Sequence, residues 1–289
     1  MTTKARDCRS TSVDPVRASG GPRFVLSAIM VCVLLLTGFT AAAEEVDVEL
    51  VIAVDVSRSM TEGELRIQRR GYAEALRSEA VARAVENTLT GKVAITYVEW
   101  GGINWQRVIV DWHIVENGQD LATFAQKIAL TVDTGMRRTS ISGAIADAAA
   151  RIERNDIRSL RRVIDISGDG PNNSGPPVTG ARDAAVAMGI TINGLPLMTR
   201  EGLGARFHLE DLDEYYHHCV IGGPGSFMVV ANTFADFARA IRKKLILEIA
   251  DARPPAPQER IVLAAGPAAP RETPPCDIGE QRVQWLLEN

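Results

Sequence analysis

Oxygen-bearing side chains recur at three places along the chain where a strand is expected to end or a helix to begin. In the loop Asp55-Val56-Ser57-Arg58-Ser59, one carboxylate and two hydroxyls alternate. Thr139 stands just before a helix expected from Ile141, and Asp169 lies in a turn with glycine on both sides. The candidate site residues are therefore Asp55, Ser57, Ser59, Thr139 and Asp169.

These donors define the chemistry that the site can do. Two carboxylates with three hydroxyls suit a hard cation, and we expect Mg²⁺, with Mn²⁺ or Ca²⁺ as alternatives. Zinc and copper favour softer ligands that this set lacks. Because neutral hydroxyls make up most of the set, a bound cation keeps enough positive charge to accept a carboxylate from a protein partner. We therefore expect a binding site without catalytic residues.

The site residues must be positioned by the elements around them. From Glu45 onward, short apolar runs alternate with longer amphipathic stretches, which predicts an α/β fold: a doubly wound, mostly parallel open sheet with helices on both faces. Ligands of such sheets bind beyond the carboxyl ends of the strands, where Asp55 and Asp169 fall. The predicted strands are Val46–Val54, Lys92–Trp100, Gln106–Ile114, Arg162–Ser167, Thr191–Leu197 and Phe227–Ala231.

The connections between these strands complete the predicted fold. Only a short glycine-containing turn separates the second and third strands, so they form a hairpin with one antiparallel edge strand. Apolar residues at helical spacing predict the helices. They are Leu65–Leu89, Leu121–Leu130, Ile141–Arg154, Thr179–Met188, Leu209–Val220 and Phe234–Ile249.

The three polar positions, in this order, resemble the metal-ion-dependent adhesion site of von Willebrand factor A domains, over roughly Val46 to Ile249. The resemblance implies that Ser57, Ser59 and Thr139 contact the metal directly. It also implies that the two aspartates hold the metal largely through water, and that a partner's acidic side chain fills the last position.

A narrower resemblance rests on the stretches 138–145, 166–173 and 220–225, which look like an uncharacterised family of exported bacterial proteins with a domain of unknown function. This resemblance implies a fold and a location, but no partner. The sequence departs from the commoner A-domain pattern at two places. Ser142 stands where that pattern often has Gly, and Ser167-Gly168 stands before Asp169 where that pattern usually has a Thr-Asp-Gly turn.

The first 43 residues have the layout of a secretory signal peptide. Basic residues precede an apolar stretch that ends in Ala41-Ala42-Ala43, ahead of Glu44. Cleavage after Ala43 exports a domain of residues 44–250 to the periplasm or the medium, with no membrane attachment. The alternative is an uncleaved anchor, since about 20 apolar residues can span a bilayer. Residues 251–289 are rich in Pro and Ala, which predicts a flexible tail.

Charge and cysteine content narrow the function further. The formal net charge is −4 and no basic run follows the leader, so we expect no nucleic-acid partner. Two cysteines, Cys219 and Cys276, remain beyond the signal peptide. In an oxidising compartment they can form one disulfide that ties the tail to the domain; the alternative is two unpaired thiols.

Three functions are compatible with this sequence. The first is an exported, metal-dependent, adhesion-type domain that binds an acidic group of a partner. The second is a metal-assisted phosphohydrolase with Asp55 as nucleophile, although Ser57 replaces the acid expected two residues later. The third is a metal-free structural scaffold. His217-His218 gives no competing metal site, because adjacent residues on a helix point about 100° apart.

Overall fold

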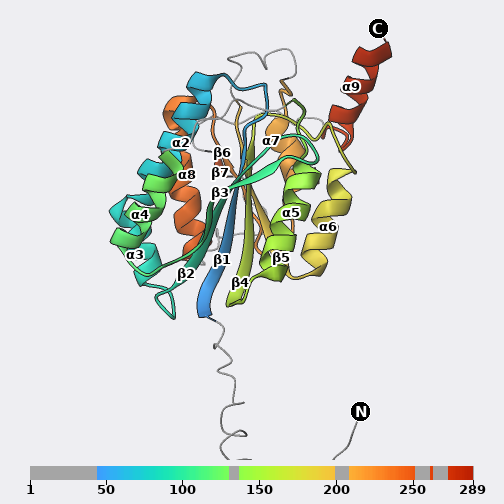
Figure 1. Ribbon diagram of the computed structural model, residues 1–289. Helices are drawn as coiled ribbons and strands as arrows, with labels where there is room; N and C mark the ends of the chain where they lie inside the picture. The colour runs from blue at the N-terminus through green and yellow to red at the C-terminus, as the bar shows by residue number, and fades with distance from the viewer. Residues whose placement is uncertain (1–43, 130–136, 199–207, 251–260, 263–272, 289) are drawn as a thin grey trace, which may run out of the picture. The chain divides into compact units, whose positions relative to one another are not determined.

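The computed structural model describes residues 44–129, 137–198, 208–250, 261–262 and 273–288 (Figure 1). The signal peptide predicted at residues 1–43 lies outside these residues, as does much of the segment predicted as a tail. None of the helices within the described ranges combines the length and the hydropathy needed to span a bilayer.

Five strands form the central sheet, in the order β3-β2-β1-β4-β5. Their bounds are β1 Glu44–Asp55, β2 Val93–Trp100, β3 Gln106–Val115, β4 Ile157–Gly168 and β5 Ile190–Pro196. Neighbouring strands are parallel except for β3, which runs antiparallel to β2 at the edge. The predicted doubly wound, mostly parallel sheet with one antiparallel edge strand is confirmed.

The sixth predicted strand is shorter than expected. β6 spans only Val229–Val230 and pairs in parallel with β7, Ile261–Val262, in a separate two-stranded sheet. Isolated parallel bridges from Gly194 to Met228 and from Leu197 to Ala231 connect this segment to the region of β5. The chain thus follows the predicted path, but with few of the ladder hydrogen bonds of a regular strand.

Helices cover both faces of the sheet (Figure 1). One layer contains α2 Glu62–Leu76, α3 Glu79–Glu86, α4 Gly118–Ala129 and α8 Phe234–Ile249. The other contains α5 Ile141–Arg154, α6 Val178–Ala187, α7 Leu212–Tyr215 and the π-helix η2 Tyr216–Val220. Alternate residues of β1 face the two layers, because side chains of a strand point to opposite sides. Leu50 and Ile52 pack with the first layer, and Val51 and Ala53 with the second.

Two helix predictions are wrong in detail. The predicted helix Leu65–Leu89 is two helices, because the chain turns at Arg77-Ser78, where the hydroxyl of Ser78 donates to the carbonyl of Ala75 at 2.6 Å. The turn interrupts a continuous apolar periodicity, which is why the pattern did not reveal it. The predicted helix Leu209–Val220 is the short α7 followed by η2.

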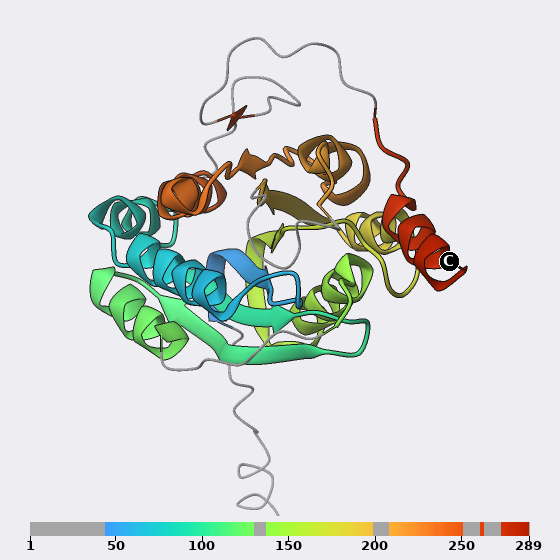
Figure 2. The same cartoon turned by 90° about the horizontal axis from the view of Figure 1, so that it is seen from above.

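The C-terminal segment, expected to be a flexible tail, contains the helix α9, Ile278–Glu288. A disulfide joins Cys219 of η2 to Cys276. Of the two alternatives that the sequence left open, a disulfide or two unpaired thiols, the structure has the disulfide. The Pro- and Ala-rich composition of the preceding residues masked the short helical run that follows them. Figure 2, which looks down on the carboxyl ends of the parallel strands, shows α9 on the side of the sheet covered by α5 and α6.

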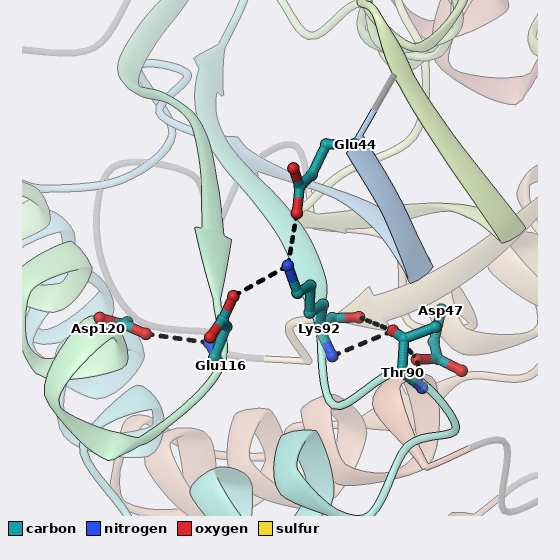
Figure 3. Close-up of polar contacts among 6 residues, drawn as sticks. All are labelled: Glu44, Asp47, Thr90, Lys92, Glu116 and Asp120. Carbon is teal, nitrogen blue, oxygen red and sulfur yellow. Dashed lines mark hydrogen bonds and ion pairs between the residues drawn. The ribbon is translucent and has the colours of Figure 1, made fainter. Parts of the chain in front are cut away.

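A polar network lies at the end of the sheet opposite the carboxyl ends of the parallel strands (Figure 3). Lys92 Nζ lies 2.7 Å from Oε1 of Glu44 and 3.2 Å from Oε1 of Glu116. Nearby, Thr90 donates its hydroxyl and its backbone N–H to the carboxylate of Asp47. Burial acts to raise the pKa of Asp47, but hydrogen bonds outweigh it and lower the pKa below its ordinary value. These contacts join the start of β1 to β2 and β3.

Candidate metal centre

The register of the sheet brings the two acidic loops together. Val54 of β1 pairs with Ser167 of β4, so Asp55 and Gly168 end neighbouring strands at the same level. A Cβ on Gly168 would stand 3.0 Å from Oδ2 of Asp55 and 2.9 Å from the hydroxyl of Tyr216. An added Cβ would therefore require the Tyr216 hydroxyl and the Asp55 carboxylate to shift away from this turn.

Hydrogen bonds link Asp55 to Asp169 through the two serines. The backbone N–H of Ser57 donates to Oδ1 of Asp55 at 2.7 Å, and the hydroxyl oxygens of Ser57 and Ser59 are 2.9 Å apart. The hydroxyl of Ser59 then donates to Oδ1 of Asp169 at 2.8 Å. Four of the predicted site residues thus form one connected set, although Asp169 is distant from the others in sequence.

Thr139 reaches the site from the loop before α5. Its backbone N–H donates to Oδ1 of Asn173 at 2.8 Å, and its carbonyl accepts from the N–H of Asn173 at 2.8 Å. Arg138, immediately before it, has a φ of 77°. Residues with side chains rarely adopt this left-handed conformation, which marks a sharply turned, strained backbone. Ser140 caps α5 by accepting from the N–H of Gly143.

A cavity of about 460 Å³ collects these side chains. Ser57, Ser59, Thr139 and Asp169 are among the described residues that line it, together with part of α9. Asp55 is fully buried and does not line the cavity. The fold therefore brings all five predicted site residues to one place, with four on the cavity wall and one enclosed in the protein.

The two carboxylates are electrostatically crowded. Burial raises the pKa of Asp55 well above its ordinary range, and the nearby charge of Asp169 raises it further. Burial also raises the pKa of Asp169, to about 6, although the hydrogen bond from Ser59 opposes this. Oδ2 of Asp55 has no hydrogen-bond partner among the described residues. A bound cation would relieve both the repulsion between the two carboxylates and the unsatisfied hydrogen bonding of the buried oxygen.

The donor set fits a hard divalent cation. No group of three or more His, Cys, Asp or Glu side chains able to hold a metal ion occurs within the described part of the chain. A metal at this site therefore depends on the hydroxyls of Ser57, Ser59 and Thr139, which are ligands for Mg²⁺, Mn²⁺ or Ca²⁺ rather than for softer ions. The assignment of Mg²⁺ to these residues stays a prediction.

Three supporting residues were not identified from the sequence. Gln68 of α2 donates its Nε2 to the carbonyl of Asp55 at 2.9 Å. Tyr216 of η2 brings a buried hydroxyl against Gly168, and this hydroxyl has no hydrogen-bond partner in the described structure. Asn173 holds Thr139. Gln68 and Tyr216 look like ordinary residues of amphipathic helices, and only the adjacency of Asn173 to the Asp169 turn gave any signal.

Comparisons with known proteins address the family and the fold. The family model described as "Protein of unknown function (DUF1194)" matches residues 45–253. The curated proteins yield no match. Among solved structures, the pilus adhesin SpaC from Lactobacillus rhamnosus GG, in its open conformation, is 13% identical with a TM-score of 0.51, over 72% of this chain and 30% of that chain.

Two further solved structures are similar at lower TM-scores. A von Willebrand factor type A protein from Catenulispora acidiphila is 15% identical, with a TM-score of 0.46, over 71% of this chain and 43% of that chain. Proximal thread matrix protein 1 from the mussel byssus, with a zinc-occupied MIDAS motif, is 14% identical, with a TM-score of 0.48, over 72% of this chain and 48% of that chain. The chain spans less than half of the length of each of these structures. At such identities the likeness concerns the fold alone.

Proposed function

The chain belongs to the DUF1194 family of proteins of unknown function and has a von Willebrand factor A-like fold; from this premise we propose that it is an exported, adhesion-type domain that binds a protein partner through a divalent cation. One observation carries the proposal. Hydroxyls and carboxylates from three separate loops meet around one cavity, with a buried carboxylate oxygen that lacks a partner.

The residues of the candidate metal centre fall into two groups in this proposal. The hydroxyls of Ser57, Ser59 and Thr139 hold the cation, and the carboxylates of Asp55 and Asp169 supply the compensating negative charge. When bound, Mg²⁺ supplies a Lewis-acidic position that can accept a carboxylate oxygen of the partner. Mn²⁺ and Ca²⁺ are the alternative ions.

Two observations favour binding over catalysis. The described residues that line the cavity include no histidine or cysteine to act as base or nucleophile. Asp55, the nucleophile of the phosphohydrolase alternative, is fully buried and does not line the cavity. An attacking carboxylate must contact its substrate. We therefore propose a binding role for this site in preference to the phosphohydrolase alternative.

Export is supported by the disulfide between Cys219 and Cys276. Such bonds form and persist in oxidising compartments and are rare in the cytosol. The signal peptide predicted at residues 1–43 is consistent with that environment. We place the mature protein in the periplasm or the medium.

Calorimetric titration of Mg²⁺ into the purified protein tests the proposal. We expect saturable binding and a rise in the melting temperature, with about 2.7 kcal/mol of added stability at 100 times the dissociation constant. Ser57→Ala and Asp169→Asn should lose both effects, whereas Ser226→Ala, outside the cavity lining, should retain them. Unchanged binding in the two site variants, or no binding of Mg²⁺, Mn²⁺ or Ca²⁺ to the wild type, would refute the proposal.

A further inference from the structure

The helix α9 forms part of the wall of the cavity at the candidate metal centre. Val283, Leu286 and Leu287 line the cavity beside Asp169. Leu286 is 43% exposed, Leu287 is 76% exposed and the adjacent Trp285 is 63% exposed. Large apolar side chains are usually covered in a folded protein, so this helix presents an apolar strip next to the polar site.

Specific contacts fasten α9 in this place. The disulfide from Cys276 to Cys219 anchors the residues before the helix. At its first turn, Oε1 of Glu280 accepts from Nδ2 of the buried Asn172 at 2.6 Å. Gly279 lies so close to the same loop that a Cβ there would stand 2.0 Å from the carbonyl oxygen of Asn172. The apolar strip is therefore a fixed part of the cavity wall.

Positive charge surrounds the same cavity. Four of its described lining residues are arginines: Arg58, Arg137, Arg138 and Arg282. They come from the β1 loop, from the loop before α5 and from α9, so the fold gathers them. The chain as a whole carries a net charge of −4, and composition alone does not explain this concentration. A local excess of arginine attracts acidic ligands and can bind carboxylates through two hydrogen bonds.

From these features we propose that α9 and the four arginines extend the metal centre into a docking surface for an acidic peptide segment of a partner. In that segment, large apolar side chains flank a carboxylate. The carboxylate binds at the metal centre among the arginines, and its apolar neighbours pack against Leu286 and Leu287. A cavity of about 460 Å³ takes a few side chains rather than a folded domain. The carboxylate half of this inference rests on the proposed function; the apolar half rests on α9 alone.

A synthetic peptide tests the recognition chemistry. The probe is a fluorescein-labelled peptide with Leu-Asp-Leu between glycine–serine flanks, titrated with the protein in the presence of Mg²⁺ and followed by fluorescence polarisation. We expect about tenfold weaker binding when the central Asp becomes Asn, and again when both Leu become Ser. A display library of random peptides, selected on the immobilised protein, should enrich the same acidic and apolar combination.

Variants of the protein test the surface. The double substitution Leu286→Asn with Leu287→Asn should weaken binding of the Leu-Asp-Leu peptide about tenfold while the Mg²⁺ titration stays unchanged. Leu89→Asn is the matched control, since Leu89 is 84% exposed and does not line the cavity. It should bind the peptide like the wild type.

The outcomes separate this inference from the proposed function. Peptide binding that needs Mg²⁺ but is indifferent to the Leu286 and Leu287 substitutions overturns the role of α9 and leaves the proposed function standing. Binding that needs the leucines and survives chelator supports the α9 surface and overturns the metal-dependent function. No binding of either the probe or a selected peptide overturns the inference. So does a wild-type dimer that the leucine variants convert to monomer, because a second copy is then the occupant.

Discussion

At the scale of single residues, the candidate metal centre depends on a position without a side chain. The Cβ of Gly168→Ala would stand 3.0 Å from Oδ2 of Asp55 and 3.2 Å from its Cβ. Because the surroundings are buried, the Asp55 carboxylate must move. We expect Mg²⁺ affinity to fall about tenfold and the protein to lose about 1–3 kcal/mol of stability.

Calorimetry and thermal melts check this expectation. The matched control is Gly170→Ala, on the other side of Asp169, where an added Cβ would meet nothing within 4 Å. The control should bind Mg²⁺ like the wild type. Equal affinities for the two alanine variants would show that the close approach at Gly168 does not matter.

A second residue-scale prediction concerns the strained backbone before Thr139. Arg138 has a φ of 77°, a conformation that costs a residue with a side chain about 1–2 kcal/mol and glycine almost nothing. Arg138→Gly should therefore raise the free energy of unfolding, by up to about 1 kcal/mol after the greater freedom of glycine in the unfolded chain is counted. Urea denaturation measures the change. Arg154→Gly, in the last turn of the regular helix α5, is the control and should lower stability; two equal losses would contradict the prediction.

The sequence predicted the residues of the site better than their surroundings. Asp55 ends a strand, Asp169 follows one and Thr139 stands before a helix, so a local pattern locates all three. The sheet register brings the loops of Asp55 and Asp169 together. Gln68 and Tyr216 reach the same place from α2 and η2. Their contribution depends on how helices pack over the sheet, which leaves no local signal.

At the scale of elements, a buried charge cluster attaches α8 to the sheet. Lys244 Nζ lies 2.6 Å from Oδ1 of Asp165 on β4 and also contacts the carboxylate of Glu248, and all three side chains are buried. The carboxylates of Asp165 and Glu248 share one ammonium group, so one of the two carboxylates easily retains a proton. Burial raises the pKa of Glu248 to about 7. The positive charge of Lys244 acts to lower this pKa, and the negative charge of Asp165 acts to raise it.

The raised pKa of Glu248 predicts a pH dependence of stability. The folded protein binds this proton more tightly than the unfolded chain, whose ordinary pKa is 4.5. The contribution to stability is therefore fully present below about pH 4.5 and is lost as the pH rises to about 7. Glu248→Gln removes this titration.

Urea denaturation of the wild type and Glu248→Gln at a series of pH values measures this effect. The free energy of unfolding of the wild type, relative to that of Glu248→Gln, should fall as the pH rises from about 4.5 to about 7. Ser226→Ala, which changes no titratable group, serves as the control and should give a constant difference from the wild type. A constant difference for Glu248→Gln would exclude the titration of this group as the cause.

Two helices, α5 and α8, could be predicted in full from the sequence. α5 and α8 have the predicted bounds, and both begin after a side-chain cap, from Ser140 and Thr233. The break at Arg77-Ser78 lies inside a continuous apolar periodicity, so two helices looked like one. α9 was missed because it follows a long stretch rich in Pro and Ala.

A further element-scale prediction tests how α9 is held. A Cβ on Gly279 would stand 2.0 Å from the carbonyl oxygen of Asn172, a backbone atom that cannot rotate away. Gly279→Ala should therefore displace α9 and make the bond after Arg282 more accessible to trypsin. Gly180→Ala in α6, with nothing within 4 Å of the added Cβ, is the control and should be cleaved like the wild type. Equal cleavage of both variants would show that α9 does not need this contact.

At the scale of the whole molecule, the sheet separates two tasks. Lys92 and Asp47 fasten one end of β1, whereas Asp55 at its other end belongs to the candidate metal centre. The alternation of apolar and amphipathic segments predicted the position of Asp55, because parallel strands place their carboxyl ends at the same edge of the sheet. The contacts of Lys92 and Asp47 were not predicted. The attachment of α9 to that rim was not predictable, since the sequence left the pairing of Cys219 and Cys276 open.

The disulfide therefore provides the prediction that concerns the whole chain. It links residues 57 positions apart, so its loss should lower the free energy of unfolding by about 2–4 kcal/mol, mainly through the greater freedom of the unfolded chain. Thermal melts with and without reductant, on the wild type and on Cys219→Ala with Cys276→Ala, measure this. Mg²⁺ affinity should persist, because Ser57, Thr139 and Asp169 lie on loops of the sheet, whereas binding of the Leu-Asp-Leu peptide should weaken as α9 is released. If reductant abolishes Mg²⁺ binding while the protein stays folded, the metal centre itself requires α9. The metal centre and the apolar surface of α9 are then not independent, and this prediction is wrong.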